Sequence, residues 1–152
     1  ITVRKSPWPR LQRIHGDFHL GQVLAVGDDW VIVDFEGEPL RPMTERSEPD
    51  LPLRDVAGML RSFDYVAGAV LHNGSTAAER DATEWARSAR IAFLAGYSET
   101  NPIAERAGPG LLEALELDKA LYEAVYEARN RPQWLGIPVE AVQRLAGVLS
   151  TP

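Results

Sequence analysis

The pattern of hydrophobic and polar positions changes character near residue 53. Before it, two short β-rich runs at 22–25 and 30–35 flank Gly27-Asp28-Asp29, a composition typical of a tight hairpin turn. After it, apolar residues recur at three- and four-residue spacing, as in helices that bury one face. The pattern therefore predicts a mainly α fold in which one small β-hairpin precedes about four helices.

The predicted helices cover 53–71, a segment beginning at Ser75 or Thr76, 111–130 and 138–149. The expected buried face of the first helix is Leu53, Val56, Ala57, Leu60, Phe63 and Val66 or Ala67. That of the second is Ala82, Trp85, Ala89, Phe93 and Tyr97, and that of the third is Leu117, Leu121, Ala124, Val125 and Ala128. Residues 1–13 are expected to be a connector leading into a short strand that ends near Ile14. The segment 36–52 holds four prolines and many charges, which predicts an irregular surface loop.

Composition narrows the class of protein. The 152 residues are 45% hydrophobic, which suits one globular domain. The net charge of -6 comes without a basic cluster, so a nucleic-acid partner is not expected. No apolar run approaches the roughly 20 residues that cross a bilayer, and cysteine is absent, which excludes disulfides and thiolate sites. We expect a soluble, cytoplasmic protein with no membrane partner.

Two short stretches carry the candidate chemistry. They are His15-Gly16-Asp17-Phe18-His19-Leu20-Gly21-Gln22 and Val31-Ile32-Val33-Asp34-Phe35-Glu36-Gly37. Phosphoryl transfer from ATP needs a carboxylate that accepts the proton of the attacking hydroxyl, and oxygen ligands for Mg²⁺. In the order of a kinase catalytic loop, Asp17 is the candidate catalytic base, and Gln22 and Asp34 are the candidate metal ligands.

Gln22 and Gly16 stand where a protein kinase has Asn and Arg, and the motif resembles the aminoglycoside phosphotransferase and choline kinase branch instead. Within that branch, 15–22, 34–39, 53–65 and 122–138 are similar to bacterial maltokinases. The resemblance implies the C-terminal lobe of a protein-kinase-like fold over 1–152, with 14–37 as catalytic loop and hairpin and 53–149 as helical subdomain. It also implies transfer of the ATP γ-phosphate to maltose, giving maltose 1-phosphate; some relatives are fused to a trehalose synthase.

Other residues are expected to support the site. His15 is expected to brace the catalytic loop and Asp55 to anchor it, while for His19 sugar contact and loop bracing are equally open. Tyr122, Tyr126 and Asn130 recur every four residues on one helix and form a candidate sugar-binding stripe. Glu123, Arg131 and Trp134 are weaker candidates near the same end.

The kinase interpretation requires parts that the sequence does not show. Lys5 and Lys119 are the only lysines, and neither lies in a phosphate-cradling loop. We therefore expect that the N-terminal ATP-binding lobe is absent from this chain and that the 152 residues alone are inactive.

Three alternatives remain. A glucosamine kinase or another small-molecule phosphotransferase of the same branch would keep Asp17, Gln22 and Asp34 but change the pocket. An amino-sugar kinase should have extra carboxylates where Tyr122 and Tyr126 stand. A metallophosphoesterase or zinc site is disfavoured, because only three histidines are present. A non-catalytic scaffold lobe would explain the fold without any reaction.

Overall fold

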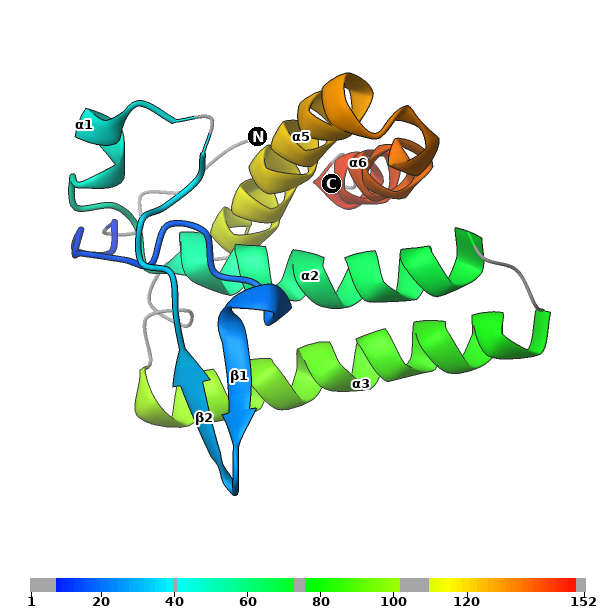
Figure 1. Ribbon diagram of the computed structural model, residues 1–152, viewed down its shortest axis with the longest axis horizontal. Coiled ribbons are helices and arrows are strands. Elements are labelled where there is room, and N and C mark those ends of the chain that lie inside the picture. Colours follow the sequence, from blue (N-terminus) through cyan, green and yellow to red (C-terminus); the bar gives the residue numbers. More distant parts are fainter. Residues whose placement is uncertain (1–7, 40, 73–75, 102–109, 150–152) are drawn as a thin grey trace.

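The long helix α2 (Leu53–His72) forms the centre of the molecule. The computed structural model describes residues 8–39, 41–72, 76–101 and 110–149. In it, α2 packs against α3 (Thr76–Thr100) on one side and α5 (Leu111–Asn130) on the other, as Figure 1 shows. The helix α6 (Gly136–Leu149) then packs on α5, after a 3₁₀ turn at Pro132–Trp134.

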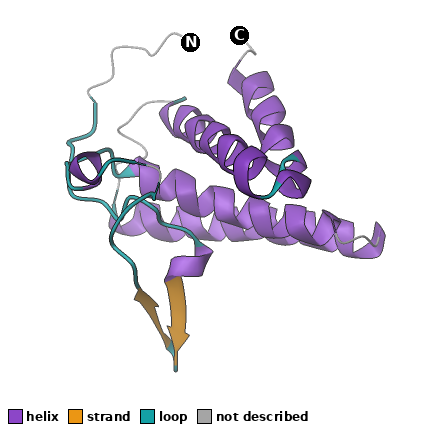
Figure 2. Cartoon of the chain, turned by 45° about the horizontal axis from the view of Figure 1, so that its top comes forward, coloured by secondary structure: helices purple, strands orange, loops and turns teal. Residues whose placement is uncertain are grey.

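A β-hairpin projects from the helices (Figure 2). The 3₁₀ turn Leu20–Gln22 leads into β1 (Val23–Val26), which pairs antiparallel with β2 (Asp29–Ile32). Val26 pairs with Asp29, which leaves a two-residue turn of Gly27 and Asp28, and Gly27 has the positive φ of 63° that such a turn needs. The predicted hairpin is therefore confirmed, with its second strand ending at Ile32.

Two local predictions before α2 are wrong. The segment 36–52 is not wholly irregular, because α1 (Met43–Arg46) forms one helical turn directly after Pro42. No strand ends at Ile14 within the described residues. Gln12 instead makes an isolated antiparallel bridge with Asp50, whose backbone groups exchange hydrogen bonds of 3.0 and 2.9 Å. This bridge ties the described part of the connector to the segment before α2.

The core forms on the predicted face of α2. Buried apolar side chains of α2 meet Ala86 of α3 and Leu111 and Leu115 of α5; those of α2 are Leu53, Val56, Ala57, Met59, Leu60, Phe63 and Ala67. A smaller cluster joins Ala120 of α5 to Ala141 and Leu145 of α6. The helical periodicity of residues 53–71 therefore predicted the central packing correctly.

The predicted buried face of α5 is correct only in part: Leu117 packs against the smaller cluster, but two other members face solvent. Leu121 and Val125 are 50% and 48% exposed, whereas the buried residues are Leu111, Leu115, Glu116, Ala120 and Glu127. Two of these are carboxylates that are paired with arginines, Glu116 with Arg90 and Glu127 with Arg131. Hydrophobic spacing cannot detect a face that is buried through ion pairs.

The prediction for α3 holds only in part. Phe93 packs against the core and lies edge-on to Phe63, with 6.0 Å between ring centroids. Trp85 also lies edge-on to Phe63, but it is 44% exposed and is therefore not a core residue. α3 begins at Thr76, and the alternative N-cap Ser75 lies outside the described residues.

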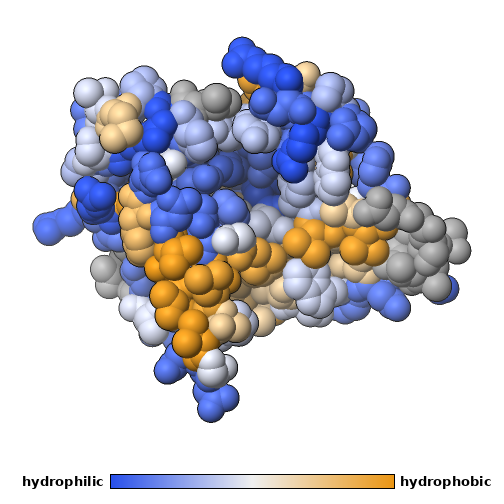
Figure 3. All heavy atoms as spheres, in the orientation of Figure 1, coloured by the Kyte–Doolittle hydropathy of each residue, from blue (hydrophilic) through white to orange (hydrophobic). Residues whose placement is uncertain are grey.

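The hairpin presents apolar side chains to solvent. Figure 3 shows a hydrophobic patch over the hairpin that continues along α2. Its exposed members on the hairpin include Leu24, Val26, Trp30, Val31 and Ile32. A two-stranded hairpin with both faces exposed is marginal in water unless something packs against it.

Among the described residues, no helix is long and apolar enough to cross a membrane.

Candidate active site

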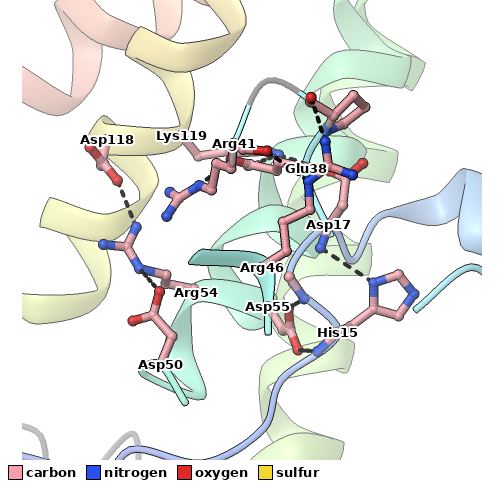
Figure 4. Close-up of polar contacts among 12 residues, drawn as sticks. His15, Asp17, Glu38, Arg41, Arg46, Asp50, Arg54, Asp55, Asp118 and Lys119 are labelled. Atoms are coloured by element: carbon pink, nitrogen blue, oxygen red, sulfur yellow. Dashed lines mark hydrogen bonds and ion pairs between the residues drawn. The ribbon is translucent and has the colours of Figure 1, made fainter. Parts of the chain in front are cut away.

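The loop that carries Asp17 is fastened to the start of α2. The two carboxylate oxygens of Asp55 accept hydrogen bonds from the backbone N–H groups of His15 at 2.7 Å and Gly16 at 2.9 Å (Figure 4). Burial raises the pKa of Asp55, and these two N–H groups oppose that rise. Asp55 therefore lies where an anchor of the catalytic loop was predicted.

His15 braces the same loop from inside. Its side chain is buried, and its Nε2 lies 2.7 Å from the carbonyl oxygen of Val33. Since a carbonyl only accepts, Nε2 donates, and this leaves Nδ1 to accept the backbone N–H of Asp17 at 3.3 Å. The ring also lies 4.7 Å from that of Phe35. His15 thus joins the Asp17 loop to the end of the hairpin, as a bracing residue should.

Two glycines permit close backbone approach around the loop. Gly16 has a φ of 84°, which side chains disfavour, and a Cβ there would lie 3.2 Å from the Cα of Gly37. Gly58 of α2 faces the carbonyl oxygen of Phe18, and a Cβ at this position would lie only 2.6 Å from that oxygen. The loop therefore rests directly on the backbone of α2.

Asp17 itself is partly exposed and has two charged or titratable neighbours. Its Oδ1 lies 3.1 Å from Lys119 Nζ, and its Oδ2 lies 3.8 Å from His19 Nε2. Burial lowers the pKa of His19, and Asp17 and Asp34 only partly offset this, so the ring is neutral at and above neutral pH. A neutral imidazole beside Asp17 can exchange hydrogen bonds with a hydroxyl group.

Gln22 and Asp34 meet at the open end of the hairpin. The amide nitrogen of Gln22 donates to Asp34 Oδ2 at 2.9 Å, and the backbone N–H of Val33 donates to the Gln22 carbonyl at 3.0 Å. Asp34 has a φ of 65°, a strained conformation for a non-glycine residue that often marks a functional site.

This pair suits Mg²⁺. The ion commonly takes one or two protein oxygens and completes its shell with water and phosphate oxygens. A carboxylate next to an amide, at an exposed position, offers that donor set once the amide turns its oxygen inward. No group of three or more His, Asp or Glu residues that could hold a metal occurs in the described part of the chain. One carboxylate and one amide are a donor set that fits an ion whose remaining ligands are water and phosphate oxygens.

A cavity of about 380 Å³ opens beside Asp17. Its walls come from the loop that carries Asp17, from α2 and from α5, and they include the predicted substrate residues His19, Tyr122 and Tyr126. Asn130 is not among its lining residues; it is exposed, and its amide nitrogen donates to the Tyr126 carbonyl at 2.8 Å. The structure therefore brings three of the four predicted substrate residues together with Asp17.

Carboxylates line the cavity next to the tyrosines. Glu123 pairs with the buried Arg61 at 2.7 Å, and burial raises the pKa of Glu123 although Arg61 opposes the rise. Glu127 pairs with Arg131 at 2.5 Å and accepts a hydrogen bond from the Tyr65 hydroxyl. Arg131 lies 5.7 Å from the centroid of the Tyr126 ring. The wall is thus aromatic and polar, and its acidic groups already have cationic partners.

Sequence reasoning missed two residues at this site, Lys119 and Glu38. Lys119 Nζ lies 2.5 Å from Glu38 Oε1 as well as near Asp17. Burial lowers the pKa of Lys119, but Glu38 and Asp17 outweigh burial and raise it, so the amine stays protonated. No pattern in the sequence linked Lys119 to Asp17, which is 102 residues away, or to Glu38, which is 81 residues away.

Comparison with known proteins finds glucosamine kinases that are similar to this chain. No family model matches the chain. Glucosamine kinase from Mycolicibacterium smegmatis is 36% identical over 134 residues, which cover 86% of this chain and 33% of that protein. The chain is homologous to part of glucosamine kinase. The glucosamine kinase of Streptacidiphilus jiangxiensis is 30% identical over 128 residues, covering 82% of this chain and 29% of that protein.

Solved glucosamine kinase structures agree with this relationship. One, in complex with glucosamine, ADP and inorganic phosphate, superposes with a TM-score of 0.78 at 29% identity and covers 89% of this chain and 33% of its own. Another, crystal form B, gives a TM-score of 0.80 at 28% identity, covering 90% of this chain and 34% of its own. The predicted helical fold with a small hairpin is confirmed as matching part of glucosamine kinase.

The chain corresponds to only part of each relative, and this limits what the comparison shows. The chain spans about a third of the length of the glucosamine kinases it matches. The comparisons support the predicted resemblance to sugar kinases as far as similarity to part of glucosamine kinase, whereas the finer maltokinase prediction receives no specific support.

Proposed function

We propose that this chain supplies the catalytic base and the metal ligands of an ATP-dependent sugar kinase. One observation carries the proposal: Asp17 lines a cavity of about 380 Å³, and the loop that holds Asp17 ends at Gln22, which is hydrogen-bonded to Asp34. A phosphoryl acceptor in the cavity and a metal-bound phosphate at the hairpin would then meet at Asp17. Homology to glucosamine kinase supports the same reaction class.

In this proposal Asp17 accepts the proton of a sugar hydroxyl. The sugar oxygen forms a bond to the γ-phosphorus while the bond between that phosphorus and the leaving oxygen of ADP breaks. Gln22 and Asp34 would hold Mg²⁺, which would neutralise charge on the phosphates. His19, next to Asp17, would hydrogen-bond the same hydroxyl and fix its direction.

The exposed apolar hairpin supports binding of a nucleotide near Gln22. β1 begins at Val23, directly after the candidate metal ligand, and the hairpin exposes Leu24, Trp30 and Ile32. A purine base has apolar faces that favour such a surface. ATP bound with its phosphates at Gln22 and Asp34 would place its base within reach of the hairpin.

Glucosamine is our first candidate acceptor. The relatives are glucosamine kinases, and one solved structure contains glucosamine. The extra carboxylates that an amino sugar requires do not replace Tyr122 and Tyr126, but Glu123 and Glu127 lie next to them in sequence and line the same cavity. An ammonium group in this cavity would find acidic partners beside aromatic faces.

Maltose is the second candidate, and the pairing of those carboxylates favours it. Glu123 is bound to Arg61 and Glu127 to Arg131, so neither offers an uncompensated negative charge to an ammonium group. A neutral sugar would use the tyrosines and the polar rim without disturbing these ion pairs. The sequence motifs that resemble maltokinases support the same acceptor.

The test is ADP release by the full-length protein with Mg-ATP and a panel of acceptors. Glucosamine, glucose and N-acetylglucosamine form a matched set in which only glucosamine carries a cation, and maltose is assayed beside them. Activity with glucosamine alone supports the first candidate, and activity with maltose alone supports the second. Absence of sugar-dependent ADP release would overturn the proposed function and favour a scaffold.

A further inference from the structure

Lys119 is the one lysine among the described residues, and it comes to Asp17 from α5, far from the catalytic loop in sequence. Its side chain is only 16% exposed, and its amine contacts Asp17 Oδ1 at 3.1 Å and Glu38 Oε1 at 2.5 Å. Figure 4 shows the amine between the two carboxylates. A protonated amine that bridges two acids in a partly buried setting has a defined position.

The anchor of Lys119 is itself held in place. Glu38 is 5% exposed, and its other carboxylate oxygen accepts a hydrogen bond from Arg41 Nε at 2.9 Å. Arg46 of α1 donates hydrogen bonds to the backbone carbonyl oxygens of Arg41 and Pro39. These bonds tie α1 to the backbone that directly follows Glu38. The amine of Lys119 also lies 5.0 Å from the centroid of the Tyr122 ring. The segment after the hairpin therefore fixes the lysine that contacts Asp17.

This contact determines how Asp17 presents its oxygens. An aspartate side chain can rotate about two bonds. A carboxylate that accepts the proton of a reacting hydroxyl must keep one oxygen directed at that hydroxyl. Lys119 holds Oδ1 of Asp17, while Oδ2 lies on the side of His19, which lines the cavity of about 380 Å³ together with Asp17. Lys119 itself lines both this cavity and a smaller one of about 50 Å³ that Glu38 also lines.

We propose that Lys119 is a positioning residue that orients Asp17 for proton abstraction, and that Glu38 holds Lys119 in the position this requires. The inference rests on the proposed function, because it assigns Asp17 the role of base. It gives the segment 36–50 a role in catalysis, since Glu38 and Arg41 set the position of the amine. Loss of the lysine should therefore reduce turnover more than substrate binding.

The experiment compares four variants in the full-length protein, assayed with Mg-ATP and the preferred sugar. Lys119→Met removes the charge, and Lys119→Arg keeps it. The double variant Lys119→Met with Glu38→Gln removes the amine together with the buried carboxylate that it would leave unpaired. Arg129→Met is the matched control, because it removes an exposed cation from the same helix. Melting temperature, kcat and both KM values are measured for each.

We expect Lys119→Met to lower kcat by about 10–100-fold with both KM values within about threefold, since a small misplacement of a catalytic group costs up to about 10²-fold. Lys119→Arg should recover most of kcat. The double variant should recover the melting temperature but not kcat, and Arg129→Met should match wild type. Recovery of kcat in the double variant, or unchanged kcat in Lys119→Met, would overturn the inference. If the wild-type protein shows no sugar-dependent ADP release, the proposed function fails first.

Discussion

Asp55 Oδ1 accepts the backbone N–H of Gly16 at 2.9 Å, so the first turn of α2 carries the loop that holds Asp17. The other oxygen of Asp55 accepts the N–H of His15. One side chain thus satisfies two successive backbone donors, and this arrangement fixes the position of the loop before any substrate binds. The position of the candidate base is therefore constrained through the backbone of its loop as well as through its side chain.

The first prediction concerns this anchor. Asp55→Ala should lower the free energy of unfolding by about 2–4 kcal/mol, because it leaves two partly buried N–H groups without acceptors. Chemical denaturation measures the change. Asp118→Ala is the control: Asp118 makes an exposed ion pair with Arg54, and its loss should cost roughly 0.5 kcal/mol or less. Equal effects of the two substitutions would show that Asp55 does not anchor the loop.

The second prediction concerns Gly58. Gly58→Ala would place a Cβ 2.6 Å from the Phe18 carbonyl oxygen, so the loop or α2 must shift. We expect a loss of roughly 1–3 kcal/mol in stability, as for other overpacked sites. Gly96→Ala in α3 meets no atom within 4 Å and should instead stabilise the helix by roughly 0.5–1 kcal/mol. Similar melting temperatures for the two variants would contradict the close approach.

The third prediction concerns the protonation of His19. Burial lowers its pKa below 6.5 and Asp17 opposes the shift, so Asp17→Asn should lower it further. Imidazole proton resonances followed by NMR across pH give both midpoints. Because the folded state binds its proton less readily than the unfolded chain, the contribution of His19 to stability falls as pH drops below 6.5. A midpoint above 6.5, or one raised by Asp17→Asn, would be inconsistent with this environment.

The fourth prediction concerns Tyr126 in the wall of the cavity of about 380 Å³ beside Asp17. Tyr126→Ala should raise the KM for the sugar by roughly 2–10-fold with little change in the KM for ATP, because an aromatic contact contributes about 0.5–1.5 kcal/mol. Val125→Ala is the control on the neighbouring, exposed position of α5. Steady-state kinetics of the two variants decide the matter, and an unchanged sugar KM in Tyr126→Ala would remove Tyr126 from the acceptor site.

The sequence predicted those parts of the molecule that depend on local pattern. The hairpin followed from its turn composition and α2 from its apolar spacing, and both are present. Candidate roles for Asp17, Gln22 and Asp34 were assigned from their order along the chain, and the role of Asp17 as base stays a proposal. In the structure, Gln22 and Asp34 are hydrogen-bonded to each other, while their metal-binding role stays a proposal.

The parts that the sequence did not predict depend on buried charge. The inner face of α5 includes Glu116 and Glu127, which are buried because Arg90 and Arg131 pair with them. Periodicity counts such residues as polar, so the predicted face was rotated toward Leu121 and Val125. Lys119 was overlooked for the same reason: its burial is offset by Glu38 and Asp17, which are distant in sequence.

The most direct test of the central claim is the turnover of Asp17→Asn in the full-length protein, measured as ADP released with Mg-ATP and the preferred sugar. The substitution preserves the size of the side chain but removes the proton acceptor, so kcat should fall by about 10²–10⁴-fold while the melting temperature stays close to wild type. A folded Asp17→Asn protein that keeps wild-type kcat would contradict the assignment of Asp17 as the base.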